Sequence, residues 1–100
     1  MESDEGKKKA SEMIDLFART TDSKEMASLF EDLFTAAEID DFILRFALMD
    51  DIYKGKSQRL IAKERSLSLC KITRGSKILK KKDGFLRRYF SSLYDDHLHL

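Results

Sequence analysis

The chain of 100 residues contains no proline and no tryptophan, one cysteine and four glycines. The lack of proline and the wealth of Leu, Lys, Glu, Ala and Asp favour helices over strands. A single cysteine excludes a disulfide framework and fits a reducing compartment. No apolar run approaches the roughly 18 residues that cross a bilayer, and no apolar core follows the charged N-terminus as in a secretory signal. We therefore expect an all-α cytoplasmic protein without a membrane partner.

Charge is distributed very unevenly along the chain. Residues 54–82 hold eleven Lys or Arg and one acid, Glu64, whereas residues 1–53 hold six bases and fourteen acids. The formal net charge of +1 therefore hides a strongly basic segment on an acidic chain. A compact basic segment of this kind is typical of a nucleic-acid-binding module.

Apolar spacing and capping residues predict six helices in one domain. Thr35 and Glu38 form a capping-box pattern, which predicts a helix that runs to about Tyr53 and stops at Gly55. Another helix is expected at residues 10–19, and one that carries Phe34 is expected after Ser23 as its cap. Ser57 is expected to cap a helix that runs to about Arg65, and Ser68 to cap one that runs from Leu69 to about Leu79. The last helix is expected from Asp83 onward. Residues 1–9 are expected to form a flexible arm, residues 10–54 and 83–96 a dimerisation core, and residues 57–79 a helix-turn-helix within a single domain of residues 10–100.

The helix expected before Gly55 is apolar on nearly every side. Residues 42–49 are all apolar except Arg45. Such a helix has to be buried on every side, and a chain of this length offers few partners to surround it. The sequence therefore predicts an intertwined six-helix homodimer, since two-fold dimers are the commonest oligomers.

Residues 57–79 have the properties of a helix-turn-helix, in which the second helix enters the major groove. A small residue, Ala62, suits close packing of the two helices, and their shared core is predicted to contain Ile61, Leu67, Leu69 and Ile72. The exposed face of the second helix then presents Cys70, Lys71, Thr73, Arg74 and Lys77, of which the cations suit phosphates and guanine edges. The alternative is a solvated charged face that serves solubility.

Arg45 lies within the apolar block, and a buried guanidinium needs an anionic partner. One candidate is an acid of the same helix, either Asp41, four residues earlier, or Glu38, seven residues earlier. The other candidate is a bound carboxylate. Residues 80–82, three consecutive lysines, could bind phosphate or be a solvated helix end. Cys70 is expected to be a free thiol. His97 and His99 have too few neighbouring ligands for a metal site, and no catalytic set is found, so we expect neither metal nor enzyme activity.

Several of these residues carry a resemblance to the tryptophan repressor family over Leu29 to Tyr94. The run Ile72-Thr73-Arg74-Gly75-Ser76, followed by Leu79-Lys80, resembles a family motif. Ser57-Gln58-Arg59, the Thr35–Glu38 pair and Arg45 also fall in register. The resemblance implies a transcriptional repressor, an intertwined dimer that binds a palindromic operator, and L-tryptophan as a candidate corepressor.

The resemblance also implies roles for individual residues. It assigns corepressor contacts to Arg45, Arg74, Thr35 and Gly75. It assigns DNA contacts to Gln58, Arg59, Ala62, Leu69, Cys70, Lys71, Thr73, Lys77 and Lys80. The chain departs from the family at Lys71, which replaces a threonine, and at Ile78, which replaces a serine. It also departs at Arg65, where an apolar residue is expected, at Ser66, which replaces a turn glycine, and at Asp32. Two alternatives stay open: a regulator of the same fold that does not use tryptophan, and a helical dimer that binds an acidic protein.

Overall fold

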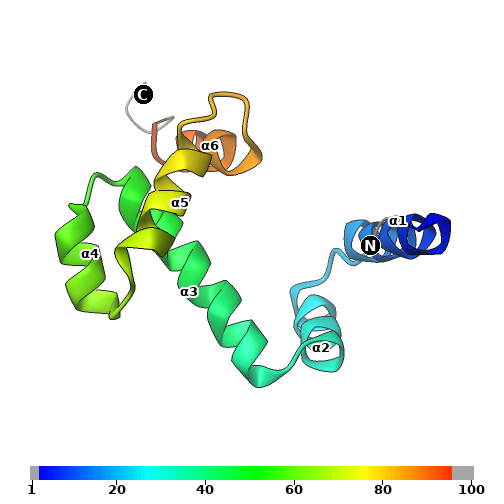
Figure 1. Ribbon diagram of the computed structural model, residues 1–100. Helices are drawn as coiled ribbons and strands as arrows, with labels where there is room; N and C mark the ends of the chain where they lie inside the picture. Colours follow the sequence, from blue (N-terminus) through cyan, green and yellow to red (C-terminus); the bar gives the residue numbers. More distant parts are fainter. Residues whose placement is uncertain (1–2, 96–100) are drawn as a thin grey trace. The chain divides into compact units, whose positions relative to one another are not determined.

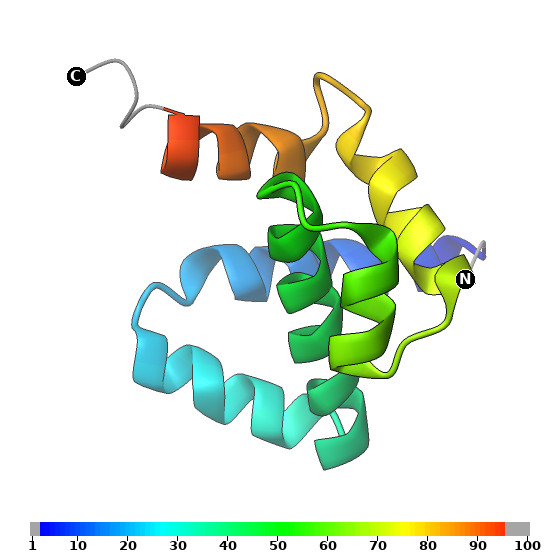
Figure 2. The same ribbon diagram turned by 90° about the vertical axis from the view of Figure 1, so that its left-hand side faces the viewer.

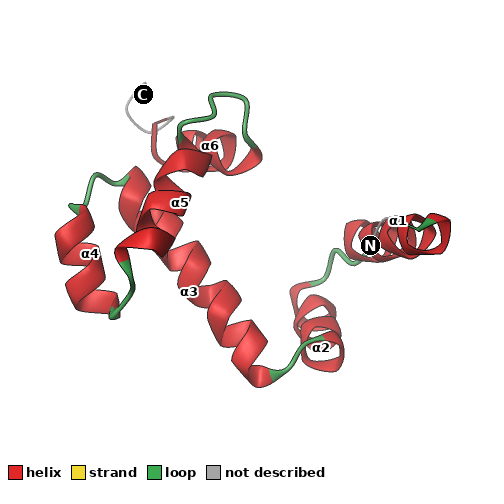
Figure 3. Cartoon of the chain, viewed as in Figure 1, coloured by secondary structure: helices red, strands yellow, loops and turns green. Residues whose placement is uncertain are grey.

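The computed structural model describes residues 3–95 and is all-helical over that range, as the sequence predicts (Figure 3). By their backbone contacts, the residues divide into two compact units, Met1–Asp40 and Asp41–Leu100. Each unit is described by itself below. The prediction of a single domain over residues 10–100 stays a prediction. No helix within residues 3–95 is long and apolar enough to cross a bilayer.

The first unit begins with α1, Asp4–Arg19, which starts six residues earlier than the sequence predicts. The Ser3 hydroxyl caps this helix by accepting a hydrogen bond from the Gly6 backbone N–H at 3.0 Å. Asp4 and Glu5 in the first turn complement the positive end of the helix dipole. Residues 4–9, predicted as part of a flexible arm, are therefore helical because local capping suffices without apolar burial.

The second helix of this unit, α2, spans Ser23–Leu33. Its cap is Asp22 and not Ser23, because the Asp22 carboxylate accepts from the Glu25 backbone N–H at 3.0 Å. The ring of Phe30 lies between those of Phe17 and Phe34, with centroids 5.8 and 5.3 Å away. These aromatic contacts connect α1 to α2 and to the segment that follows.

The capping box at the start of α3, Ala36–Tyr53, is confirmed. The Thr35 hydroxyl accepts from the Glu38 N–H at 3.1 Å, and the Thr35 N–H donates to the Glu38 carboxylate at 2.9 Å. The helix ends at Tyr53, as predicted, and Gly55 follows with a φ of 90°. This positive φ favours glycine.

The second unit combines the C-terminal part of α3 with α4, Gln58–Arg65, and α5, Leu69–Leu79 (Figures 1 and 2). Leu48, Ile61 and Ile72 come from these three helices and form one buried cluster. Ala62 and Leu67 pack against it, so the predicted core of the helix-turn-helix is confirmed at these positions. The prediction for Leu69 is wrong: it occupies the first position of α5, where the helix leaves the turn, and is 56% exposed.

A second buried cluster joins α3 and α5 to α6, Phe85–Phe90. It contains Met49, Leu79 and Phe90. The cap of α6 is Gly84, one residue later than the predicted start. The π-helical turn Ser91–Asp95 continues from α6 and brings Tyr94 over the ring of Phe90. These contacts hold α6 against the end of α5.

The apolar middle of α3 is only partly buried within one chain. Leu48 and Met49 are buried, whereas Ile43 is 61% exposed and Phe46 about half exposed. On α6, Phe85 is also largely exposed. Burial on every side, which the sequence predicts for the dimer, therefore stays a prediction.

Candidate functional site

The α4–turn–α5 segment has local signals at each of its corners. The Ser57 hydroxyl accepts from the Leu60 N–H at 3.2 Å, and the Ser68 hydroxyl accepts from the Lys71 N–H at 3.4 Å. Between the helices, Ser66 ends α4 with a left-handed conformation, φ 53° and ψ 43°. The left-handed Ser66 and the Ser68 cap thus define a turn short enough for the helices to share the Ile61–Ile72 core.

Most residues with an implied role in DNA binding are exposed on this segment. Gln58 and Arg59 lie in the first turn of α4, and Ala62 is half-buried at the contact with α5. The exposed residues of α5 and its C-cap are Leu69, Cys70, Lys71, Thr73, Lys77 and Lys80. The Thr73 hydroxyl donates to the Leu69 carbonyl at 2.9 Å. The structure therefore places the basic and polar side chains around one helix pair.

The cations of this segment fall into two groups. Of the eleven bases in residues 54–82, Lys54, Lys56 and Arg65 form ion pairs with acids. The other eight make no ion pair with any residue of the described range: Arg59, Lys63, Lys71, Arg74, Lys77, Lys80, Lys81 and Lys82. Their charge is therefore available to an anionic partner.

A buried ion pair that the sequence did not reveal connects α3 to α4. The Arg65 Nε donates to Asp51 Oδ2 at 2.5 Å, and the Asp51 side chain is only 8% exposed. The hydrogen bond from Arg65 lowers the pKa of Asp51 and raises the pKa of Arg65. Lys56 lies 3.8 Å from Asp51 and 2.9 Å from Glu64, so it extends the network along α4. The only sign of this ion pair in the sequence is an acid, Asp51, near the end of an apolar helix.

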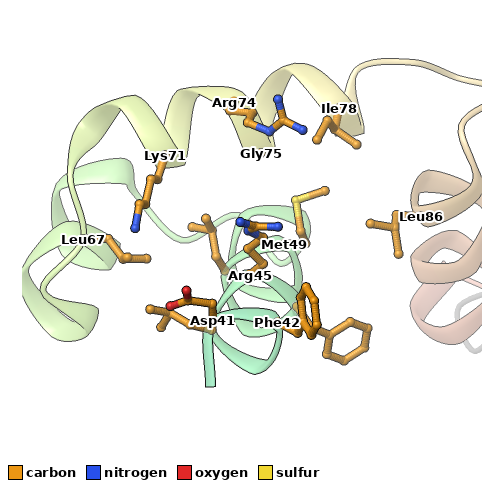
Figure 4. Close-up of a pocket in the computed structure, with 13 residues that line it drawn as sticks. Asp41, Phe42, Arg45, Met49, Leu67, Lys71, Arg74, Gly75, Ile78 and Leu86 are labelled. Carbon is orange, nitrogen blue, oxygen red and sulfur yellow. The ribbon is translucent and has the colours of Figure 1, made fainter. Parts of the chain in front are cut away.

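A pocket of about 420 Å³ lies within the second unit, between α3 and α5 (Figure 4). Its wall is mainly apolar, with a cluster of charged side chains. The lining residues are Asp41, Phe42, Leu44, Arg45, Phe46, Leu48, Met49, Leu67, Lys71, Arg74, Gly75, Ile78 and Leu86. A concave apolar site with a few convergent polar groups is typical of small-ligand binding.

Three of the four residues with an implied corepressor role line this pocket: Arg45, Arg74 and Gly75. The Arg45 side chain faces the pocket and is exposed within one chain, so its burial, which the sequence predicts for the dimer, stays a prediction. Its guanidinium forms no ion pair with Asp41 or with any other residue between 3 and 95. An acid of the same helix is therefore not the partner of Arg45 in this structure. A bound carboxylate, the other candidate partner, stays a prediction.

Gly75 lets α5 approach α3 closely. A Cβ atom at this position would lie 3.0 Å from Ile52 Cδ1 and 3.1 Å from Met49 Sδ. Both distances are shorter than ordinary van der Waals contact, so a side chain here would push against the pocket wall. Gly75 therefore permits the close contact of α5 with α3, and its implied contact with a corepressor stays a prediction.

Thr35 is the exception among the residues with an implied corepressor role. It belongs to the first unit, and its hydroxyl caps α3. Its contact with a ligand stays a prediction. Of the further candidates, Cys70 is a free, exposed thiol. No three His, Cys, Asp or Glu side chains within residues 3–95 are grouped as a metal site would require. His97 and His99 lie outside the described residues.

Together, the all-helical fold and the basic α4–turn–α5 pair define a helix-turn-helix protein with a ligand-sized pocket behind its second helix. The model of the Trp repressor protein family matches residues 8–93. The chain belongs to this family of DNA-binding transcription regulators, which is not an enzyme family. Comparison with curated proteins and with solved structures gives no match.

Proposed function

We propose that this chain is a homodimeric transcriptional repressor of the cytoplasm that binds a palindromic operator. The observation that carries the proposal is the set of eight cations around α4 and α5 that have no acidic partner in the described part of the chain. Phosphates are the partners that such cations suit, and base edges in the major groove suit the exposed face of α5. The buried Ile61–Ile72 core supports this face.

The exposed apolar side chains support the dimer. Ile43 and Phe46 on α3 and Phe85 on α6 are large, apolar and about half exposed or more. A second copy of the chain is the proposed cover, because a two-fold dimer buries such faces on both chains. The α5 helices of the two chains would then lie about one DNA turn apart, roughly 34 Å. At this spacing they would enter successive major grooves, as helix-turn-helix dimers do.

We further propose that a small carboxylate ligand binds between α3 and α5. Its binding shifts the population of α5 orientations toward the one that binds DNA. Arg45 and Arg74 face this pocket, and neither has an acidic partner between residues 3 and 95. L-tryptophan is the candidate ligand that the family suggests. Because the chain contains no tryptophan, fluorescence of added tryptophan reports its binding directly.

The experiment that tests DNA binding is a titration of labelled duplexes at several salt concentrations. If six or more phosphates are neutralised, affinity should fall by about 10³-fold or more between 50 and 200 mM salt. Lys77→Ala should weaken binding, whereas Lys24→Ala on α2 should not. Failure to bind any duplex at 100 mM salt would overturn the proposal and leave an acidic protein as the partner.

A further inference from the structure

The pocket between α3 and α5 has more positive charge than one carboxylate can neutralise. Figure 4 shows Arg45 extending from α3 and Lys71 from α5 into the space between the two helices, with Arg74 along α5. None of these three side chains forms an ion pair or hydrogen bond with another residue of the described range. Asp41 is the one acid among the lining residues.

The charges decide which ligand suits the pocket. Three cations and one acid leave a formal charge of +2 on the lining. A zwitterionic amino acid leaves this charge unchanged, and a single carboxylate reduces it by one. Two anionic groups neutralise it. Like charges that converge from opposite walls repel each other, and an anion placed between them relieves this repulsion.

The apolar residues of the lining indicate which uncharged group of the ligand the pocket suits. Phe42, Met49, Ile78 and Leu86 give the pocket an apolar wall away from Lys71. Its volume of about 420 Å³ lies in the range of small-molecule pockets, and its apolar wall suits an apolar body such as an aromatic ring. Apolar area removed from water would then supply affinity, and the cations would select the charge.

We propose that the pocket takes a ligand with an aromatic body and two anionic groups, and that Lys71 binds the second anion. This proposal rests on the ligand pocket of the proposed function. Arg45 and Arg74 meet the first anion, as above. Lys71 reaches the pocket from the first turn of α5, where the helix dipole adds to its positive charge.

Asp41 suggests a competing hypothesis, in which the pocket binds a zwitterion and not a doubly charged anion. Its carboxylate lies at the same end of the pocket as Lys71 and Leu67 (Figure 4). If Asp41 receives a ligand ammonium, the pocket selects a zwitterion. If instead it only reduces the excess positive charge, its removal makes a doubly charged anion bind more tightly. Removing this one charge therefore weakens the binding of a zwitterion under the first hypothesis and tightens the binding of a doubly charged anion under the second.

Three ligands with the same body separate the two hypotheses. In 3-(indol-3-yl)propanoate, L-tryptophan and (indol-3-ylmethyl)malonate, the α-carbon carries hydrogen, an ammonium and a second carboxylate, respectively. Titration calorimetry on the full chain should find the malonate tightest, by about tenfold over the propanoate, since a charge-assisted contact is added. L-tryptophan as the tightest of the three would overturn the proposal.

Two variants and one control assign the effect to Lys71. Lys71→Met should abolish the advantage of the malonate over the propanoate and leave the affinity for the propanoate within about twofold. Lys77→Met, on α5 but outside the pocket lining, should leave the advantage unchanged. Asp41→Asn should tighten the malonate. A malonate advantage that survives Lys71→Met, or is weakened by Asp41→Asn, contradicts the proposal.

The same preparation should be tested for DNA binding without ligand. If none of the three ligands binds while the salt-dependent affinity for duplexes is present, the inference about the ligand is wrong and the proposed DNA-binding function stands. If DNA binding is absent while the malonate binds through Lys71, the reverse holds. The two failures are therefore distinguishable.

Discussion

Arg65 on α4 donates a hydrogen bond of 2.5 Å to the buried carboxylate of Asp51 on α3. Within the family resemblance, Arg65 stands where an apolar residue is expected. The helix-turn-helix is therefore attached to α3 partly by a charge pair where apolar packing is expected. A buried pair of this kind contributes little over an apolar contact, but removing one partner leaves an uncompensated charge.

The first prediction concerns stability and pH. Arg65 lowers the pKa of Asp51 in the folded chain, with Lys56 and Lys54 adding to the effect. The pair therefore stabilises the fold above the unfolded pKa of about 3.9, and this contribution is lost as pH falls through the lowered folded pKa. Urea denaturation should show Asp51→Asn destabilised by about 2 kcal/mol at pH 7 and much less at pH 2.5.

The matched control for this prediction is Glu12→Gln on α1. Glu12 pairs with Lys9 at 3.0 Å, but both side chains are at least half exposed. An exposed pair of this kind contributes about 0.5 kcal/mol or less. Equal losses for Asp51→Asn and Glu12→Gln at pH 7 would contradict the role of the buried pair.

The second prediction concerns the turn. Ser66 has a φ of 53°, a left-handed conformation that costs a non-glycine residue about 1 kcal/mol. Ser66→Gly should therefore raise the free energy of unfolding by about 0.5 kcal/mol after the entropy that glycine adds to the unfolded chain. Ser76→Gly, inside α5, should lower it by a similar amount. Thermal denaturation that gives the same sign for both substitutions would contradict the strain at Ser66.

The third prediction separates ligand binding from DNA binding. Arg45 lines the pocket, and Lys80 caps the far end of α5. Arg45→Met should weaken a carboxylate ligand about tenfold and leave ligand-free DNA affinity unchanged, because a charge-assisted contact is lost only in the pocket. Lys80→Met should weaken all duplexes about equally and leave the ligand unaffected. Calorimetry and fluorescence anisotropy measure the two affinities, and a common effect of both variants on both affinities would refute the assignment.

The fourth prediction concerns the effect of ligand on stability. A carboxylate ligand that binds the folded chain at 100 times its Kd should add about 2.7 kcal/mol to the free energy of unfolding. Arg74→Ala should reduce this gain, since Arg74 lines the pocket. A thermal shift assay with millimolar L-tryptophan provides the measurement. Absence of any shift in the unmodified chain would exclude tryptophan as the effector.

Local signals explain which parts of the fold were predictable. The Thr35–Glu38 capping box and the serines at 57 and 68 act through backbone groups three residues away, so the sequence places α3, α4 and α5 correctly. The start of α1 was missed because its stability depends on a cap and two acids, not on apolar spacing. Local signals therefore define elements better than apolar periodicity at exposed helix ends.

The contacts between helices at the candidate site could not be predicted from the sequence. The apolar neighbours of Arg45 in the chain do not reveal that it faces a pocket, because α5 completes this pocket from a distant part of the sequence. The Asp51–Arg65 pair joins residues fourteen apart, and no local pattern indicates it. Contacts between helices decide both cases, and a single sequence does not specify which faces meet.

The most direct test of the central claim is selection of bound DNA from a random pool by the purified full chain at physiological salt. Two cationic helix pairs held by a dimer should enrich a palindrome whose half-sites are centred about 10 base pairs apart. Lys77→Ala should reduce that enrichment, and a pocket ligand should increase it. A pool that shows no preferred sequence, with or without ligand, would contradict the claim that α5 reads DNA.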